Sequence, residues 1–332
     1  MKAIVWTKYG SPDVLQLKDV EKPTPRANEV LIRVHAATAS TADTELRRLK
    51  LPLLFAIPLR LYLGFKKPVR IRILGTEFAG EIVAAGKEVT QYSPGDQVFG
   101  YTGLGMGTYA EYLCLSETPS ALASVMAKKP ANMTYEEAAA VPFGGLEALH
   151  SLRQANIRPG QEVLIVGAGG SIGTYSVQLA KHYGAEVTGV DKPGKLEMLR
   201  SIGADHVIDY TQEDFTKNVQ TYDVILDTIG KSPFSRSLRS LNKNGTYLNA
   251  NPGLFGGVRM RWMSKSSSKR VITWTAGYTV KNLLAIKELL EAGIIKPVID
   301  RIYPLEQTAE AHRYVDTGNK KGNVIITMES FL

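Results

Sequence analysis

The chain has 332 residues, one cysteine and a formal net charge of +8. This length predicts about two domains, and its 44% hydrophobic and 22% charged residues are ordinary for a globular protein with a sizeable core. A single cysteine excludes an internal disulfide and a four-thiolate zinc site. The first residues lack the apolar core of a secretory signal, and no stretch reaches the roughly 20 apolar residues of a membrane span. A cytoplasmic protein without a membrane span is therefore expected.

The first part of the chain predicts a β-rich, barrel-like unit. Apolar and β-branched runs alternate there with turns rich in glycine and proline. These runs cover residues 2–6, 29–37, 79–86 and 96–101. The pattern then changes, because residues 134–156 have helical composition and begin with Thr134 and Glu137, the pair of a capping box.

From residue 162 onward, strand and helix patterns alternate. Strands are expected at 162–167, 185–191, 206–210, 223–230, 245–250 and 270–277, and helices at 173–184, 194–203 and 234–242. Repeated βα units predict a parallel, doubly wound sheet. The chain ends with helices at 282–295 and 304–318 and a strand at 322–328. The simplest architecture places residues 1–145 and 279–332 in one domain, with an α/β domain at 146–278 inserted between them.

A glycine-rich turn joins the first strand of this α/β domain to its helix. Its pattern is Ala168-x-Gly170-x-x-Gly173. The amide groups and dipole of a helix start make an anion site. Gly170 would let the backbone approach a pyrophosphate, and Gly173 would let the helix pack on the strand. The predicted phosphate-binding residues are Ala168, Gly170, Ser171, Ile172 and Gly173.

An acidic residue, Asp191, ends the next strand, 18 residues after Gly173. A carboxylate at this position binds the ribose diol of a dinucleotide and repels the 2′-phosphate of NADPH, so NADH is favoured over NADPH. Lys192 and Lys195 follow closely, and either lysine is an alternative partner for that phosphate or a solvated residue of a helix start. The predicted cofactor set also includes Lys195, Tyr210, Gly230 and Asn249.

These motifs together resemble the medium-chain dehydrogenase/reductase superfamily over nearly the whole chain. The stretch from residue 74 to residue 100 resembles the G-x-E-x-x-G-x-V signature of that family. It does so through Gly75, Glu77, Gly80, Val83 and Gly86, followed by Gly95 and Asp96. The resemblance implies an α/β fold with a GroES-like, β-rich catalytic domain and a Rossmann domain. It also implies a homodimer.

The residues further resemble the zinc-free quinone oxidoreductase and enoyl reductase branch. Thr76 stands where zinc-dependent alcohol dehydrogenases carry a metal-binding histidine, and Ser40 stands where they carry a cysteine. Glu77 alone cannot make a zinc site, which needs about three protein ligands. No metal is therefore expected. Without a Lewis acid, reduction of an already polarised acceptor is favoured over alcohol oxidation.

The implied reaction is hydride transfer from NADH or NADPH to a quinone or an α,β-unsaturated ketone, an enone. The substrate is expected to be a small, lipophilic carbonyl compound or quinone. The resemblance suggests Tyr62 or Thr41 as the proton donor, with Tyr101 as an alternative. Other functions stay open: an alcohol or aldehyde dehydrogenase of the same superfamily, a nucleotide-bound RNA-binding protein of the zeta-crystallin type, or a non-catalytic scaffold. The RNA alternative depends on a second basic string, residues 258–270.

One segment, residues 46–72, combines a hydrophobic run with eight Lys or Arg residues and no Asp or Glu. Its three prolines forbid one long helix, so two short helices or a folded loop are expected. Its apolar side chains are too many for an exposed loop. The family resemblance places it near the active-site mouth, which suggests a lid with Arg60, Lys66 and Lys67 turned outward. A subunit interface or simple core is the alternative, and RNA or membrane-surface roles are secondary.

Overall fold

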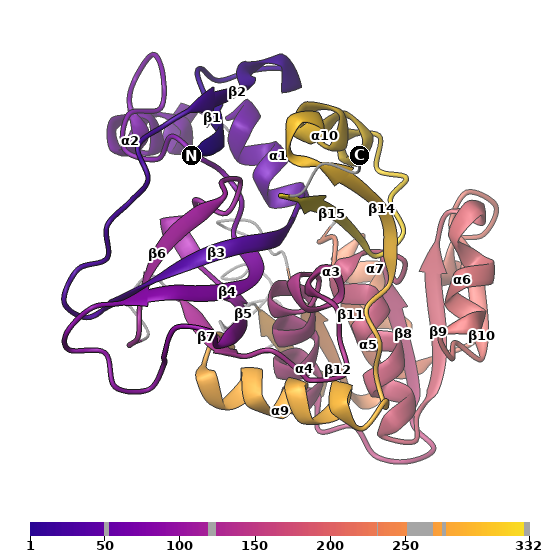
Figure 1. Cartoon of the computed structure of the whole chain (residues 1–332). Coiled ribbons are helices and arrows are strands. Elements are labelled where there is room, and N and C mark those ends of the chain that lie inside the picture. The colour runs from indigo at the N-terminus through magenta and orange to yellow at the C-terminus, as the bar shows by residue number, and fades with distance from the viewer. Residues whose placement is uncertain (50–52, 119–123, 231, 251–267, 274–276, 329–332) are drawn as a thin grey trace. The chain divides into compact units, whose positions relative to one another are not determined.

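The computed structural model describes residues 1–49, 53–118, 124–230, 232–250, 268–273 and 277–328. The chain divides into two compact units, which hold separate sheets (Figure 1). Unit 1 comprises Met1–Pro142, Tyr278–Glu291 and Ile299–Leu332. Unit 2 comprises Phe143–Gly277 and Ala292–Val298.

Unit 2 holds a six-stranded, wholly parallel sheet in the order β10-β9-β8-β11-β12-β13. With the strands renumbered along the chain, this is the 3-2-1-4-5-6 order of a Rossmann fold, which confirms the predicted doubly wound sheet. Its strands are β8 Glu162–Val166, β9 Glu186–Asp191, β10 His206–Asp209, β11 Tyr222–Asp227, β12 Leu241–Asn249 and β13 Arg270–Thr273. The helical elements are α4 Pro142–Ala155, α5 Ser171–His182, η3 Pro193–Lys195, α6 Leu196–Ser201, η4 Phe215–Lys217 and α7 Phe234–Arg239.

Burial explains why the strands of unit 2 read as continuous apolar runs. The side chains of Val163, Leu164 and Ile165 in β8 are fully buried, because the strand has a neighbour on each edge and is covered on both faces. The helix α5 packs beside β8 and β9. The glycine-rich turn therefore leads directly from the centre of the sheet into a covering helix.

Unit 1 is built on a seven-stranded sheet in the order β14-β15-β3-β4-β5-β7, with β6 also paired to β3. Strand β15 joins β3 in antiparallel register, so the last strands of the chain complete a sheet begun by the first ones. The strands are β3 Glu29–Thr38, β4 Glu77–Ala85, β5 Gln97–Tyr101, β6 Tyr112–Ser116, β7 Val125–Lys128, β14 Ile299–Pro304 and β15 Asn323–Thr327. A separate two-stranded sheet pairs β1 Lys2–Trp6 with β2 Leu15–Asp19.

Two helices of unit 1, α1 and α3, begin at capping boxes. Thr134 and Glu137 form the predicted capping box, and Ser40 and Asp43 form a second one. The helix expected over 134–156 is divided, because Pro142 has no amide to donate and restricts the residue before it. The result is α3 and α4 in succession. The helical elements of unit 1 are η1 Pro12–Val14, α1 Thr41–Arg48, α2 Leu53–Leu63, η2 Gly103–Gly105, α3 Tyr135–Ala139, α9 Val280–Glu291, η5 Leu305–Gln307 and α10 Thr308–Asp316.

One hydrophobic cluster joins the two ends of the chain within unit 1. Buried side chains from the first strand, from the segment after α2 and from the last strand contact one another there. Its members include Trp6, Leu63, Leu74, Leu305 and Ile326. The segment from residue 53 to residue 74 is therefore anchored in the core at Leu63 and Leu74. Two short helices or a folded loop were expected over residues 46–72; the described part of that segment holds only the end of α1 and one helix, α2, which contains Pro58.

Candidate cofactor site and a buried polar chain

Two glycines of the glycine-rich turn, Gly170 and Gly173, differ in the space that the protein leaves for a side chain. A Cβ on Gly173 would lie 2.4 Å from the carbonyl oxygen of Gly167 and 2.5 Å from that of Ala168, so Gly173 is required for α5 to approach the turn. A Cβ on Gly170 would meet only the Gly167 carbonyl, at an ordinary 3.4 Å. No packing against the described part of the chain demands a glycine at 170. The space beside it fits a ligand that approaches the backbone closely.

The turn also presents the positive end of a helix dipole. Gly170 is the N-cap of α5, and Ser171, Ile172 and Gly173 form its first turn. The 12-residue helix begins at this point, so the positive end of its dipole and its free backbone amides lie here. Such a helix start stabilises a phosphate group. Ala168 is fully buried beneath the turn. These residues fit a pyrophosphate, and their role as its ligands remains a proposal.

Asp191 ends β9 beside this turn and is almost fully buried. Its carboxylate accepts hydrogen bonds from the amides of Gly169 and Lys192, both at 2.8 Å. The ammonium of Lys195 lies 3.3 Å from the same carboxylate. The carboxylate therefore fastens the glycine-rich turn to β9, and Lys195 offsets its negative charge.

Asp227 is a structural residue that the sequence reasoning missed. It ends β11 with no exposed surface, and its carboxylate accepts from the amides of Ile229, Gly230 and Ser232, at 3.0, 2.8 and 3.1 Å, and from the hydroxyl of Tyr247 at 3.1 Å. Burial, followed by the charge of Asp227, raises the pKa of Tyr247 far above its usual range. An aspartate three residues before a glycine at a strand end is a turn signal that would have identified it.

The remaining predicted cofactor residues lie at the same edge of the sheet. Tyr210 follows β10 and is half-exposed, Gly230 lies in the turn after β11, and Asn249 is the buried last residue of β12. The carboxyl ends of parallel strands meet at one edge, which is where open α/β sheets bind ligands. Asn249 also lines a small hollow with Glu147, Ser151 and Ile272, among others. The fold thus brings the predicted set together along one edge.

The predicted proton donors lie in unit 1. Thr41 is the first residue of α1 and is exposed. Tyr62 lies on an exposed part of α2, with the guanidinium of Arg70 4.8 Å from its ring centroid. The alternative, Tyr101, stacks on Tyr278 with ring centroids 4.7 Å apart. None of these contacts tests a role in proton transfer, so Tyr62 and Thr41 remain proposals.

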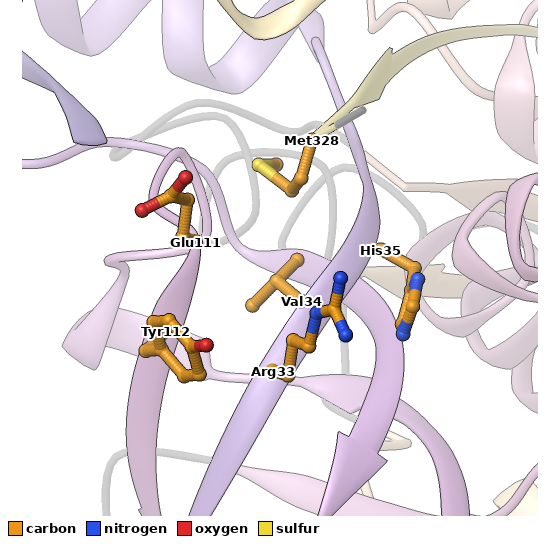
Figure 2. A pocket seen from close by; sticks show the side chains of 6 residues that line it. All are labelled: Arg33, Val34, His35, Glu111, Tyr112 and Met328. Carbon is orange, nitrogen blue, oxygen red and sulfur yellow. The ribbon is translucent and has the colours of Figure 1, made fainter. Parts of the chain in front are cut away.

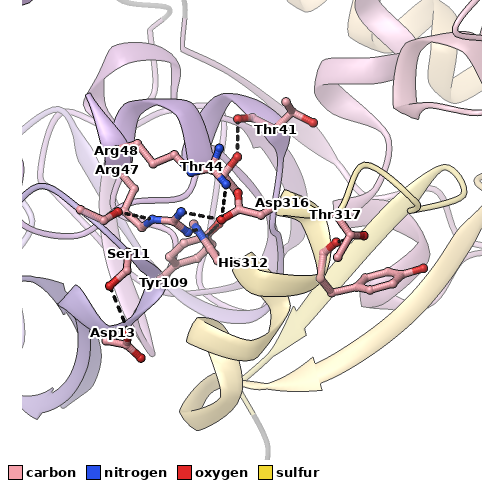
Figure 3. A network of polar contacts seen from close by, with 12 residues as sticks. Ser11, Asp13, Thr41, Thr44, Arg47, Arg48, Tyr109, His312, Asp316 and Thr317 are labelled. Atoms are coloured by element: carbon pink, nitrogen blue, oxygen red, sulfur yellow. Dashed lines mark hydrogen bonds and ion pairs between the residues drawn. The ribbon is translucent and has the colours of Figure 1, made fainter. Parts of the chain in front are cut away.

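A buried chain of polar side chains runs through unit 1 (Figure 3). The guanidinium of Arg47, whose side chain has no exposed surface, lies 3.1 Å from Nδ1 of His312 and 2.7 Å from the carboxylate of Asp316. Nε2 of His312 lies 3.1 Å from the hydroxyl of Tyr109. That hydroxyl donates to the carbonyl of Thr38 at 3.0 Å. The chain ties α1, α10 and β3 together in the core.

The chemistry of the chain sets its direction. Burial, and then the positive charge of Arg47, lowers the pKa of His312 to about 3, so the imidazole is neutral at ordinary pH. Because a guanidinium only donates, Nδ1 of His312 is the acceptor and Nε2 carries the proton. His312 therefore donates to Tyr109, which donates onward. Burial, followed by the charge of nearby Asp43, raises the pKa of the Tyr109 hydroxyl well above its usual range.

The donor set around Glu77 does not fit a zinc ion. Glu77 is buried and accepts a 2.5 Å hydrogen bond from the hydroxyl of Thr38. The hydroxyl of Ser40 is engaged with Asp43, at 2.6 Å from its carboxylate. Hydroxyls replace the thiolate and imidazole ligands that zinc prefers. Within the described ranges, no three His, Cys, Asp or Glu residues are grouped closely enough to hold a metal ion. Absence of zinc nevertheless remains a prediction.

The basic residues predicted to face outward differ in their surroundings. Lys66 and Lys67 are exposed, as expected, whereas Arg60 lies over the ring of Tyr9, 5.0 Å from its centroid. Most of the basic string at residues 258–270 lies outside the described residues. A polar pocket beside β3 has none of the predicted site residues in its wall (Figure 2). It is lined by Arg33, Val34, His35, Glu111, Tyr112 and Met328.

Across the parts of the chain that the structure describes, no helix has both the length and the apolar character needed to cross a membrane.

The sequence matches three described protein families. Residues 26–125 match the alcohol dehydrogenase GroES-like domain, and residues 202–326 match the zinc-binding dehydrogenase family. Residues 147–232 match the C-terminal domain of alanine dehydrogenase/PNT. A GroES-like domain together with a Rossmann domain, and relatives named NAD(P)H oxidoreductases, define an oxidoreductase that uses a nicotinamide cofactor.

Similarity to individual proteins identifies the family to which the chain belongs. A 2-methylene-furan-3-one reductase of Solanum lycopersicum is 31% identical, over 98% of this chain and 79% of the relative. An NADPH-dependent alkenal/one oxidoreductase of Arabidopsis thaliana is 29% identical over the same shares. The structure of the quinone oxidoreductase from Coxiella burnetii superposes with a TM-score of 0.87 at 28% identity, over 99% of both chains. The chain belongs to the medium-chain dehydrogenase/reductase superfamily, in its quinone and enone oxidoreductase branch.

Proposed function

We propose that the protein reduces quinones or α,β-unsaturated carbonyl compounds with NADH or NADPH, without zinc. The observation that carries the proposal is the row of turns at the carboxyl edge of the parallel sheet. The turn around Gly170 would supply the phosphate cradle, and Asp191 and Asn249 end two other strands, β9 and β12, at the same edge. The names of the tomato reductase and the Coxiella quinone oxidoreductase support this substrate class.

When bound, the nicotinamide supplies a hydride. The residues of this chain would bind and orient it: the first turn of α5 would hold the pyrophosphate, and Asp191 would hold the adenosine ribose. Negative charge then develops on the oxygen of the acceptor and needs a hydrogen-bond donor and a proton. We assign this role to Tyr62 or Thr41. A neutral acceptor that is already polarised needs less electrophilic help than an alcohol needs for its oxidation, which supports a reaction without a metal.

We propose NADH as the preferred cofactor, because a carboxylate at the end of β9, such as that of Asp191, would repel a 2′-phosphate. The preference is modest, since Lys195 at 3.3 Å offsets that negative charge. The name of the Arabidopsis relative points to NADPH for that protein. The physiological substrate is proposed to be lipophilic, and a homodimer and a cytoplasmic location remain predictions to be measured by gel filtration and cell fractionation.

Steady-state kinetics with purified protein test the proposal. NADH and NADPH oxidation would be followed against a panel of quinones, enones and alkenals, and alcohol oxidation would be followed with NAD+ and NADP+. Turnover of quinones or enones, with negligible alcohol oxidation, is the expected result. Alcohol turnover alone would favour the dehydrogenase alternative. Nucleotide binding without turnover of any acceptor would favour a scaffold or RNA-binding role, which a salt-dependent gel shift would then separate.

A further inference from the structure

The helix α2 is apolar on two opposite sides. Leu63 is buried in the core of unit 1, and Leu59, four residues earlier, packs against the same cluster. Ile57 and Leu61, also four residues apart, lie on the other side of the helix and are 47% and 72% exposed. A helix that is hydrophobic all round is normally covered on all sides. Here one side of α2 packs in the core of unit 1, and the other side is exposed among the residues that the structure describes.

Exposed apolar side chains also follow α2 in the chain. Phe65 and Val69 are 61% and 58% exposed, and together with Ile57 and Leu61 they form what we call the α2 patch. A set of large exposed apolar residues on one short segment marks an interaction site, whereas single exposed ones are ordinary. The α2 patch is therefore a candidate interaction surface.

Cations without counterions accompany the α2 patch. Lys66, Lys67, Arg70 and Arg72 are exposed, and none of the four forms an ion pair with a described residue. The sequence from residue 46 to residue 76 contains no Asp or Glu. Two other cations of the segment, Arg47 and Arg48, are used internally, because both pair with Asp316. The partner must therefore combine negative charge with an apolar layer.

Hydrogen bonds hold the backbone of the α2 patch in place. The hydroxyl of Tyr9 donates to the carbonyl of Gly64 at 2.6 Å, and the guanidinium of Arg60 donates to the carbonyl of Phe65 at 3.1 Å. The amide of Val69 donates to the carbonyl of Leu63 at 2.8 Å. These bonds hold the turn after α2 against the core while its apolar side chains stay outside. Such an arrangement presents hydrophobic side chains without unfolding.

We propose that the α2 patch docks the protein on an anionic lipid surface, with its apolar side chains in the interfacial region and its cations at the headgroups. Apolar residues beside unpaired Lys and Arg are the composition of surfaces that lie in the plane of a membrane interface. A second copy of the chain fits less well, because a self-complementary contact would bring two sets of four cations together. Nucleic acid would satisfy the cations, but would leave Ile57 and Leu61 without an apolar partner. This inference does not depend on the proposed reaction.

Vesicle flotation tests the proposal with full-length protein. One set of vesicles contains 30% phosphatidylglycerol in phosphatidylcholine, and the other contains phosphatidylcholine alone. The variant Leu61→Ser removes an apolar contact, and the double variant Lys66→Gln/Lys67→Gln removes two charges. Their matched controls are Val219→Ser, which changes a fully exposed valine elsewhere, and Lys217→Gln/Lys243→Gln, which changes two exposed lysines in unit 2.

The wild type is expected to float with anionic vesicles at low salt and to stay unbound with neutral ones. The lysine double variant should bind about 30-fold more weakly, since each surface cation contributes about fivefold. Leu61→Ser should bind about tenfold more weakly, while both controls bind like the wild type. Absence of vesicle binding would overturn the proposal, as would equal losses in the controls. A dimer that Leu61→Ser dissociates, or RNA binding that displaces vesicles, would assign the α2 patch to those partners instead.

Discussion

Nε2 of His312 lies 3.1 Å from the hydroxyl of Tyr109, although 203 residues separate the two in the chain. Because Nδ1 of the same ring accepts from Arg47, the proton must lie on Nε2, and His312 donates to Tyr109. The ring is therefore a fixed, neutral link between the C-terminal helix α10 and the first half of the chain. Substitution of His312 should therefore lower the stability of the protein.

Replacing His312 by Leu should lower the free energy of unfolding by about 2–4 kcal/mol, because the buried Arg47 guanidinium loses an acceptor and Tyr109 loses a donor. His312→Gln is the matched control, since its amide both accepts and donates. It should cost clearly less. Urea unfolding followed by circular dichroism would measure both. Equal costs for the two variants would show that ring packing, rather than hydrogen bonding, sets the contribution of His312.

The pH dependence of stability should carry the signature of His312. Its folded pKa of about 3 lies below the unfolded value of about 6.5, so the unfolded state binds the proton first. The stabilisation is complete above pH 6.5 and is lost as the pH falls toward 3. Between pH 6.5 and 4.5 the wild type should lose about 2–3 kcal/mol more than His312→Gln. Parallel curves would contradict a buried neutral imidazole, and the comparison cancels the contributions of Asp43 and Asp316.

The two glycines of the phosphate cradle should respond differently to substitution. Gly170→Val adds atoms where only an ordinary 3.4 Å contact awaits the Cβ, so it should cost no more than about 1 kcal/mol of stability while weakening NADH binding at least tenfold. Gly173→Ala places a Cβ 2.4 Å from a backbone oxygen and should destabilise unit 2 by about 2 kcal/mol or more. Thermal unfolding and fluorescence titration with NADH would separate the two effects. Wild-type NADH affinity in Gly170→Val would remove this turn from the cofactor site.

Cofactor preference should shift in opposite directions at the Asp191–Lys195 pair. Asp191→Asn keeps an oxygen for the Gly169 amide but removes the charge, so NADPH affinity should rise relative to NADH by on the order of 1–2 kcal/mol. Lys195→Met leaves the carboxylate without its cation, and NADPH affinity should fall. Dissociation constants of both nucleotides for both variants provide the measurement. If neither ratio moved, Asp191 would serve the turn alone and would not face the ribose.

Removal of metal should leave activity intact. Thr76 and Ser40 offer hydroxyls in place of the imidazole and thiolate that a catalytic zinc requires. Quinone reduction should therefore be unchanged after dialysis against a chelator. Elemental analysis of the purified protein is the independent check, and one tightly bound zinc per chain would contradict the expectation.

The local elements were readable from the sequence because their signals are local. An apolar run, a glycine-rich turn and an amphipathic helix follow one another from Glu162 to His182, and each is formed by residues close in the chain. The same holds for Thr134 and Glu137, whose capping box needs only one helical turn. The placement of Asp191 at a strand end followed from the same alternation. These patterns were enough to predict a doubly wound, parallel sheet with a glycine-rich turn after its first strand.

Only the tertiary structure decided which distant residues meet. Arg47 and His312 are 265 positions apart, and nothing in either segment specifies the other. Strand β14 was not expected, and the pairing of β15 with β3 joins chain segments separated by most of the sequence. Likewise, the sequence pattern of α2 does not distinguish its buried hydrophobic residues from its exposed ones. The fold buries Leu63 and leaves Leu61 exposed, because only one side of a helix can face the core that the two ends of the chain build together.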